Sequence, residues 1–244
     1  MKPIYKPKGK AKEYGDLALN IYTGCPHRCF YCFAPNVLHR NREEFHSCVE
    51  PRKNIVEETR KQIEREGITD KLIHLCFTCD PYPSGYDTTP TREIIKILKE
   101  SGNHVQILTK NGKDALRDFD FLDENDWFGI TFAGYNGYSS DETYVPKEEL
   151  CAGTIHDRLL ALRTAYENGI KTWVSAEPVI NSQDVIDFID LADYVDLWKV
   201  GKLNYHHSDI NWKEFGMRVE RLLHSKRVDY YIKDSLRKEM DKPN

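Results

Sequence analysis

The sequence predicts a single α/β domain folded as a partial barrel of six successive strand–helix units. Three observations lead to this prediction. The 244 residues suit one domain, or at most two small ones. Short apolar segments alternate six times with amphipathic segments, as expected for parallel strands joined by right-handed crossovers. Polar residues come directly after the carboxyl ends of the predicted strands, and several strands carry a polar face opposite an apolar one.

Composition narrows the functional classes. Hydrophobic residues make up 40% of the chain and aromatic residues 11%, which excludes a disordered chain. The net charge of −4 is unlike the positive field of a dedicated duplex-binding protein, although it does not exclude a nucleic-acid substrate. We find no apolar stretch long enough for a membrane span and no secretory signal. We therefore expect a cytoplasmic protein with reduced thiols and no membrane partner.

The predicted units follow one another along the chain. The strands are expected at 17–24, 71–80, 104–111, 127–134, 170–179 and 194–204, with a short closing strand at 228–233. The helices are expected at 51–67, 89–102, 113–125, 154–169, 182–192 and 210–225. Each strand is a short apolar run, and each helix is amphipathic. The first helix ends at Gly67, and the second has Pro90 in its first turn and ends at Gly102, which are typical helix boundaries.

The ends of the chain differ from its centre. We divide the chain into a basic N-terminal arm at 1–16, the barrel at 17–235 and a C-terminal tail at 236–244. The arm is rich in lysine and could touch phosphate. A run of charge is more often a solvated tail, and we interpret the arm in this way.

Period-2 alternation predicts a polar interior. In the second strand, Cys76 and Asp80 lie opposite the apolar face, and in the fourth strand Thr131 does so. In the fifth strand, Ser175 and Glu177 share a face. We assign the apolar faces to the helices, so that the polar faces point at a common interior. A doubly wound open sheet, the competing architecture, would need apolar residues on both faces. The pattern therefore favours a partial barrel around a ligand cavity.

A cysteine motif directly follows the first strand. Cys25, Cys29 and Cys32 have C-x3-C-x2-C spacing, and three thiolates on one short loop suit a soft metal centre. A structural zinc site would normally present four ligands, and an electron-transfer ferredoxin would add a fourth cysteine. On a four-iron cluster, three cysteines leave one iron free to bind a substrate or cofactor.

The motif, with its aromatic residue before the last cysteine, resembles the signature of radical S-adenosylmethionine (SAM) enzymes. These share a partial (β/α)6, TIM-like barrel, in agreement with the six units. Within that superfamily the chain resembles the spore photoproduct lyase-like, or DNA repair photolyase-like, group. The similar stretches are GKAKEYGDLALNIYTGCPHRCFYC at 9–32, TCDPYP at 78–83, LTKN at 108–111 and SAEPV at 175–179. The resemblance covers roughly residues 5–235.

The resemblance implies a cofactor set. Cys25, Cys29 and Cys32 would bind a [4Fe–4S] cluster, whose free iron would take the amino and carboxylate groups of SAM. One electron would then split SAM into methionine and a 5′-deoxyadenosyl radical. Tyr31 would lie near the adenine. An external electron donor of the flavodoxin or ferredoxin type is implied, because only one cluster site is credible.

Three strand ends offer further cofactor contacts by the same resemblance. Asp80 would meet the methionyl end of SAM, or it could only brace its loop. Lys110 would pair with the methionyl carboxylate, or it could be an exposed lysine in a turn. Thr131 could hydrogen-bond the ribose, or it could be an ordinary β-branched strand residue.

Other residues could act on the ribose or on the substrate. Glu177, with Ser175, could reach either, and Lys199 is a competing structural partner for the buried Glu177. The lyase group uses a cysteine at about this distance past the motif as a hydrogen-atom donor. Cys76 and Cys79 are candidates, but alternation places them on opposite faces, so metal or disulfide chemistry between them is disfavoured. Either could instead be a small buried hydrophobic residue.

We therefore expect a radical SAM enzyme that abstracts hydrogen from a substrate. The lyase-like case is a nucleic-acid base lesion. A peptide or small metabolite is the alternative substrate, and a non-catalytic iron–sulfur or metal-binding protein is the alternative outside enzymes. Several tyrosines in the loops after the second and fourth strands could stack on a flipped base or simply cover the barrel mouth. They are Tyr82, Tyr86, Tyr135, Tyr138 and Tyr144.

Overall fold

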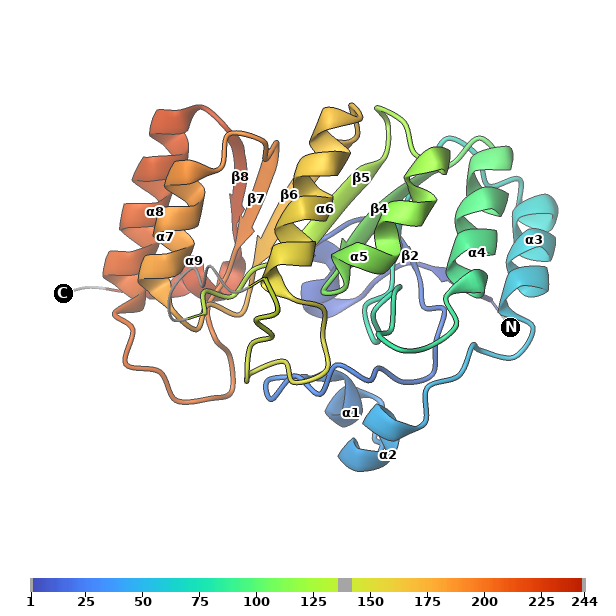
Figure 1. Ribbon diagram of the computed structural model, residues 1–244, viewed down its shortest axis with the longest axis horizontal. Coiled ribbons are helices and arrows are strands. Elements are labelled where there is room, and N and C mark those ends of the chain that lie inside the picture. The colour runs from blue at the N-terminus through green and yellow to red at the C-terminus, as the bar shows by residue number, and fades with distance from the viewer. Residues whose placement is uncertain (1, 136–141, 243–244) are drawn as a thin grey trace.

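The computed structural model describes residues 2–135 and 142–242 (Figure 1). Within these residues the strands form one sheet of eight in chain order. They are β1 (Ile4–Tyr5), β2 (Leu17–Leu19), β3 (Leu72–Leu75), β4 (His104–Thr109), β5 (Trp127–Thr131), β6 (Lys171–Ala176), β7 (Leu197–Val200) and β8 (Asp229–Ile232). The β1–β2 pair is antiparallel, and every later pair is parallel. In this part of the chain no pairing joins β8 to β1, so the sheet is an unclosed barrel and the predicted fold class is confirmed.

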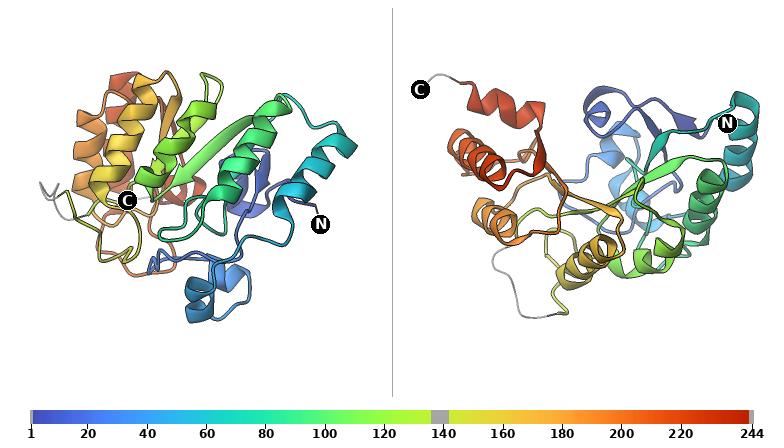
Figure 2. Two further views of the ribbon diagram at one scale, coloured as in Figure 1. Left: turned by 45° about the vertical axis from the view of Figure 1, so that its right-hand side comes forward. Right: turned by 90° about the horizontal axis from the view of Figure 1, so that it is seen from above.

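The helices that connect successive parallel strands lie on one side of the sheet. The α-helices are α1 (Ala34–Val37), α2 (Arg42–Ser47), α3 (Ile55–Glu66), α4 (Thr89–Glu100), α5 (Gly112–Ala115), α6 (Ile155–Glu167), α7 (Ser182–Leu191), α8 (Trp212–Lys226) and α9 (Asp234–Met240), and the 3-10 helices are η1 (Gly9–Glu13) and η2 (Leu116–Phe121). Figure 2 shows α3 to α8 on the convex side of the curved sheet. The sequential strand order excludes the doubly wound alternative, in which the order reverses at a switch point. No helix of the described residues is long and apolar enough to cross a membrane.

The two faces of the sheet have different chemistry. On the helix side, Phe128 of β5 contacts Phe119 of η2 with ring centres 4.8 Å apart. On the inner side, His74 and Gln106 are paired in register and share a hydrogen bond of 2.9 Å. The Trp173 indole fills the interior opposite Gly129, where a Cβ atom would lie 2.4 Å from the indole nitrogen. Glycine is therefore required at that position of β5.

The N-terminal segment is packed against the barrel. After β1 and η1, Tyr14 enters the interior, where its ring centre lies 5.5 Å from that of His74 and 5.9 Å from that of Trp173. The Lys199 ammonium donates to the backbone oxygens of Glu13 and Tyr14 at 2.8 and 3.2 Å. The last residues of the segment that composition marked as a basic arm thus lie against the interior of the sheet, whereas its lysines, Lys2, Lys6, Lys8, Lys10 and Lys12, are exposed.

Candidate active site

The cysteine loop follows β2 and is held in place by α2. The Arg42 guanidinium donates to the carbonyl oxygens of Cys29, Phe30 and Cys32. The imidazole Nδ1 of His46 lies 2.8 Å from the Cys25 carbonyl oxygen. Two side chains of one short helix therefore contact the backbone of all three motif cysteines. In Figure 1, α1 and α2 lie together beside the long connecting loops.

A glycine makes this contact with α2 feasible. A Cβ atom at Gly24, directly before Cys25, would lie 2.3 Å from the Phe45 carbonyl oxygen and 2.6 Å from that of Cys48. Since Cβ atoms do not approach oxygen that closely, only glycine lets the loop pass α2.

The motif thiols fit an iron–sulfur cluster better than a single ion. Cys25, Cys29 and Cys32 are free thiols, and burial raises the pKa of each. Thiolates there call for a bound cation to offset the lost hydration. Among the described residues, the three sulfurs are not all within 4.8 Å of one another, as ligands of one ion would be. A cluster, in which each thiolate binds a different iron, suits that wider spacing.

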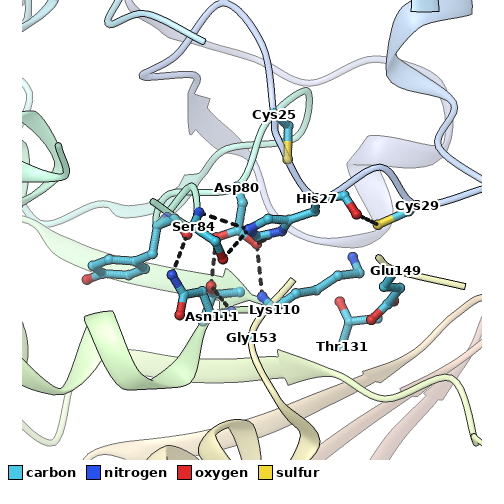
Figure 3. Close-up of polar contacts among 12 residues, drawn as sticks. Cys25, His27, Cys29, Asp80, Ser84, Lys110, Asn111, Thr131, Glu149 and Gly153 are labelled. Atoms are coloured by element: carbon cyan, nitrogen blue, oxygen red, sulfur yellow. Dashed lines mark hydrogen bonds and ion pairs between the residues drawn. The ribbon is translucent and has the colours of Figure 1, made fainter. Parts of the chain in front are cut away.

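Asp80 braces three segments around the loop (Figure 3). Its Oδ1 accepts hydrogen bonds from the Tyr82 amide at 2.9 Å and from the Thr109 hydroxyl at 2.6 Å. Its Oδ2 accepts from the Lys110 amide at 2.9 Å and lies 3.5 Å from Nδ1 of His27. The carboxylate is thus occupied by protein donors, and these contacts fit the bracing alternative that the sequence leaves open for Asp80.

His27, inside the cysteine motif, is a residue that the sequence analysis did not single out. Its Nε2 accepts hydrogen bonds from the Ser84 amide at 3.2 Å and shares one of 3.1 Å with the Ser84 hydroxyl. Burial lowers the pKa of His27 to about 4. The neutral ring accepts at Nε2, and its Nδ1 lies beside Asp80, so His27 links the cysteine loop to the loop after β3.

Lys110 directs its ammonium toward the cysteine loop. The Nζ atom lies 5.8 Å from the centre of the Tyr31 ring. Burial opposes the charge, but Cys29 and Asp80 outweigh it and the pKa of Lys110 is raised. No hydrogen-bond acceptor for this ammonium occurs within 2–135 and 142–242. A half-buried cation that these residues leave without an acceptor is suited to an anionic group such as a carboxylate.

Ser175 and Glu177 contact the N-terminal segment. The Ser175 hydroxyl lies 3.2 Å from the Tyr14 hydroxyl, which also lies 3.4 Å from Glu177 Oε2. The partner expected for Glu177 is wrong, since Lys233 and not Lys199 pairs with its carboxylate. In the sheet register Lys199 lies level with Ser175, whereas Glu177 and Lys233 both follow the ends of their strands. Thr131, at the end of β5, is buried on the same inner side.

Cys76 and Cys79 interact with each other, contrary to the alternation argument. Strand β3 ends at Leu75, and Cys76 has a φ of 70°, so the strand periodicity stops before the pair. Each thiol influences the ionisation of the other. Burial raises the pKa of Cys76. Burial opposes ionisation of Cys79 as well, but the neighbouring Cys76 thiol and the Tyr22 backbone lower its pKa overall.

The candidate stacking tyrosines are not all accessible. Tyr82 is buried and donates to Asp118 at 3.0 Å. Tyr135 is buried and accepts from Arg158 at 3.2 Å. Tyr86 is 40% exposed, and Tyr138 lies outside the described residues. Tyr82 and Tyr135 therefore belong to the core and do not form a surface on which a planar substrate could stack.

The connection between β5 and α6 forms a second support for the cysteine loop. The Phe30 amide donates to the Glu148 carbonyl oxygen at 3.1 Å, and Cys29 and Glu149 form an isolated antiparallel bridge. The Tyr31 hydroxyl donates to the Glu149 carboxylate, which pairs with Arg158. The sequence analysis missed Glu149 and Arg158, because charged residues in loops and helices are usually exposed.

A separate acidic cluster lies at the start of β4. His104, Asp123 and Asp126 place one ligand atom each within 4.8 Å of one another. The Lys99 ammonium donates to Asp123 at 2.7 Å and to Asp126 at 2.5 Å. A lysine thus already supplies the positive charge at this cluster.

Solved structures show where this fold occurs. Spore photoproduct lyase complexed with dinucleoside spore photoproduct has a TM-score of 0.66 and 14% identity, over 93% of this chain and 78% of that one. SuiB of Streptococcus suis bound to the precursor peptide SuiA has a TM-score of 0.60 and 13% identity, over 87% of this chain and 48% of that one. At these identities the likeness concerns the fold.

Comparison with known sequences identifies the family of this chain. An uncharacterized protein of Methanocaldococcus jannaschii, MJ0683, is 30% identical over 185 residues, which are 73% of this chain and 65% of that protein. The family model of the radical SAM superfamily matches residues 19–195, which include the cysteine loop and the ends of β3 to β6. The chain therefore belongs to the radical SAM superfamily, whose enzymes use a [4Fe–4S] cluster and S-adenosylmethionine.

Proposed function

We propose that this chain cleaves SAM reductively at a [4Fe–4S] cluster held by Cys25, Cys29 and Cys32 and uses the radical to abstract hydrogen from a substrate. The observation that carries the proposal is the position of Lys110. Its ammonium lies beside the Tyr31 ring and has no hydrogen-bond acceptor among the described residues. It also lies next to three free thiols. The site thus combines a cation for the SAM carboxylate with ligands for the cluster.

The chain's own residues would orient the cofactor and shield it. The bound cluster supplies the electron that breaks the sulfonium bond of SAM. Lys110 would pair with the methionyl carboxylate and Tyr31 would contact the adenine. Thr131, Ser175 and Glu177 would line the ribose or substrate side. Asp80 would act indirectly, because it accepts a hydrogen bond from the Lys110 amide and so fixes the Lys110 backbone. Exclusion of water from the site would protect the reactive species.

For the substrate we propose a base lesion in nucleic acid, as in the lyase with a similar fold. Cys76 or Cys79 would return a hydrogen atom to the product radical. The electron would come from a flavodoxin- or ferredoxin-type protein, and the reaction would take place in the cytoplasm, where thiols stay reduced.

A peptide substrate is the second candidate. A cavity of about 690 Å³ lies between η1, the ends of β7 and β8, and α9. Lysines and acidic residues both line it, including Lys12, Lys238, Glu13 and Glu239. Mixed charge of this kind suits a peptide better than a phosphate backbone, which favours cations alone.

The test is anaerobic. The chain is reconstituted with iron and sulfide, reduced with dithionite and supplied with SAM, and 5′-deoxyadenosine is measured by chromatography. Cys29→Ala should abolish the product. Cys151→Ala, which removes an exposed thiol outside the motif, should not. Wild-type protein that holds a full cluster and forms no 5′-deoxyadenosine, with or without damaged DNA or peptide, would contradict the proposal.

A further inference from the structure

Glu149 and Arg158 form an ion pair that is fully enclosed in the protein. Their side chains are both 0% exposed, and Arg158 Nη1 lies 2.6 Å from Glu149 Oε2. Glu149 belongs to the β5–α6 connection and Arg158 to α6. Burying two charges costs several kcal/mol per ion, so such a pair contributes little net stability over apolar residues. Its contacts therefore point to a role in positioning.

The Arg158 guanidinium joins the ends of two strands. Its Nε donates to the Lys110 carbonyl oxygen at 3.1 Å, and its Nη1 donates to the Thr131 carbonyl oxygen at 3.3 Å. Its Nη2 donates to the Gly153 carbonyl oxygen at 3.0 Å. The planar guanidinium thereby fixes the ends of β4 and β5 and the β5–α6 connection relative to one another.

Glycine lets the connection come close enough for these contacts. The Gly153 amide donates to the Lys110 carbonyl oxygen at 2.8 Å. A Cβ atom at Gly153 would lie 2.9 Å from that oxygen and 3.0 Å from the Asn111 Cα. The approach of the connection to β4 is therefore built into the sequence.

The Glu149 carboxylate holds the other side of the site. The Oε1 atom accepts the hydrogen bond of the Tyr31 hydroxyl, and the backbone of Glu149 forms a β-bridge with Cys29. The carboxylate thus joins the cysteine loop to Arg158, which in turn holds Lys110. The Tyr31 ring and the Lys110 ammonium lie at the two ends of this chain of contacts.

We propose that the Glu149–Arg158 pair is a positioning bridge that sets the spacing between the Tyr31 ring and the Lys110 ammonium, and with it the slot for SAM. This inference rests on the proposed function, in which those two groups contact SAM. Neither member of the pair needs to touch the cofactor itself.

Two variants separate the bridge from general stability. Glu149→Gln keeps an oxygen acceptor for Tyr31 but leaves the Arg158 charge without its partner. Tyr31→Phe keeps the ring and the ion pair but removes the hydroxyl. Glu142→Gln is the matched control, because Glu142 is exposed and lies in the same connection.

The measurement compares the Kd for SAM of cluster-loaded protein, by equilibrium dialysis, with KM and kcat for SAM cleavage. Glu149→Gln should raise Kd and KM about tenfold, as loss of an outer contact typically does, with the iron content and kcat less affected. Tyr31→Phe should raise both constants by a smaller factor. The double variant should be no worse than Glu149→Gln alone, since the two substitutions interrupt the same chain of contacts between Tyr31 and Arg158. Glu142→Gln should match wild type.

Several results would overturn the bridge. One is Glu149→Gln with a full cluster and wild-type Kd, and another is additive effects in the double variant. If Glu149→Gln does not fold, Tyr31→Phe decides alone, and an unchanged Kd there rejects the proposal. Wild-type protein that binds SAM and never cleaves it contradicts only the proposed function. Wild-type protein that binds no SAM contradicts both.

Discussion

The ammonium of Lys233 lies 3.6 Å from the centre of the Tyr14 ring and pairs with the Glu177 carboxylate. One contact thus joins the N-terminal segment, the end of β6 and the residue that follows β8. Lys233 is buried, and its pKa is raised because Tyr14 and Glu177 outweigh the burial that opposes its charge. Tyr14 is therefore part of the barrel wall.

Tyr14→Ala should destabilise the protein by about 2 kcal/mol, because it removes a packed ring and exposes two lysines that it covers. Denaturant unfolding followed by circular dichroism measures the change. Tyr205→Ala is the control, since Tyr205 is 88% exposed and its loss should cost under about 0.5 kcal/mol. Equal effects of the two substitutions would show that the N-terminal segment does not pack as described.

Asp80→Asn should destabilise the apoprotein by about 2 kcal/mol, because the new amide group faces donors that the carboxylate now accepts from. Those donors include the Tyr82 and Lys110 amides. The variant should also retain less iron after reconstitution, measured per chain against wild type. Asp16→Asn, at an exposed position, should change neither quantity. An Asp80→Asn protein of wild-type stability would exclude the bracing role.

Gly24→Ala should lower cluster retention and destabilise the fold by about 1–3 kcal/mol, because the added carbon would collide with the backbone of α2. Gly15→Ala is the matched control, since a Cβ there would have its closest neighbour at 3.8 Å. Iron analysis and thermal unfolding measure both effects. Normal iron binding by Gly24→Ala would mean that the loop can pass α2 by another path.

Acid should destabilise the apoprotein through His74. Burial lowers the pKa of His74 to about 3, so between pH 6.5 and that value the unfolded chain binds a proton that the folded chain does not. The contribution of His74 is therefore full above pH 6.5 and is lost as the pH falls, by about 1.4 kcal/mol per pH unit. His74→Leu should flatten the dependence of unfolding free energy on pH between 6.5 and 5. An unchanged slope would contradict a neutral, buried His74.

Cys76→Ala should leave 5′-deoxyadenosine formation intact and reduce formation of the final product, because its thiol would act after hydrogen abstraction. Liquid chromatography of the nucleobase products measures this once a substrate is turned over. Cys48→Ala, which alters an exposed thiol, should behave as wild type. If Cys79→Ala and not Cys76→Ala shows the loss, Cys79 is the donor.

Sequence periodicity predicted the strands well only where they are regular. The alternation in β3 holds as far as Leu75, and the positive φ of Cys76 then turns the chain out of the strand. A backbone turn of this kind leaves no mark in a pattern of polar and apolar residues. The contact between Cys76 and Cys79 was therefore missed.

The cysteine motif and the Lys110 position could be found from the sequence, because their spacing and their place at strand ends are local properties. Glu149 and Arg158 could not, because their burial depends on how a long connection folds back onto the cysteine loop. The partner of Glu177 was misjudged for a similar reason. Choosing Lys233 over Lys199 requires the register of three strands.

Protein contacts from several elements hold the cysteine loop: Arg42 and His46 from α2, Ser84 through His27, and Glu149 through Tyr31. In small zinc domains the metal itself drives folding, whereas this loop has side-chain supports from the surrounding barrel. Loss of the cluster to oxygen should therefore leave a folded chain with its thiols still arranged. A new cluster should then assemble on the folded chain from iron and sulfide, so oxidative loss of the cofactor should not require degradation and resynthesis of the protein.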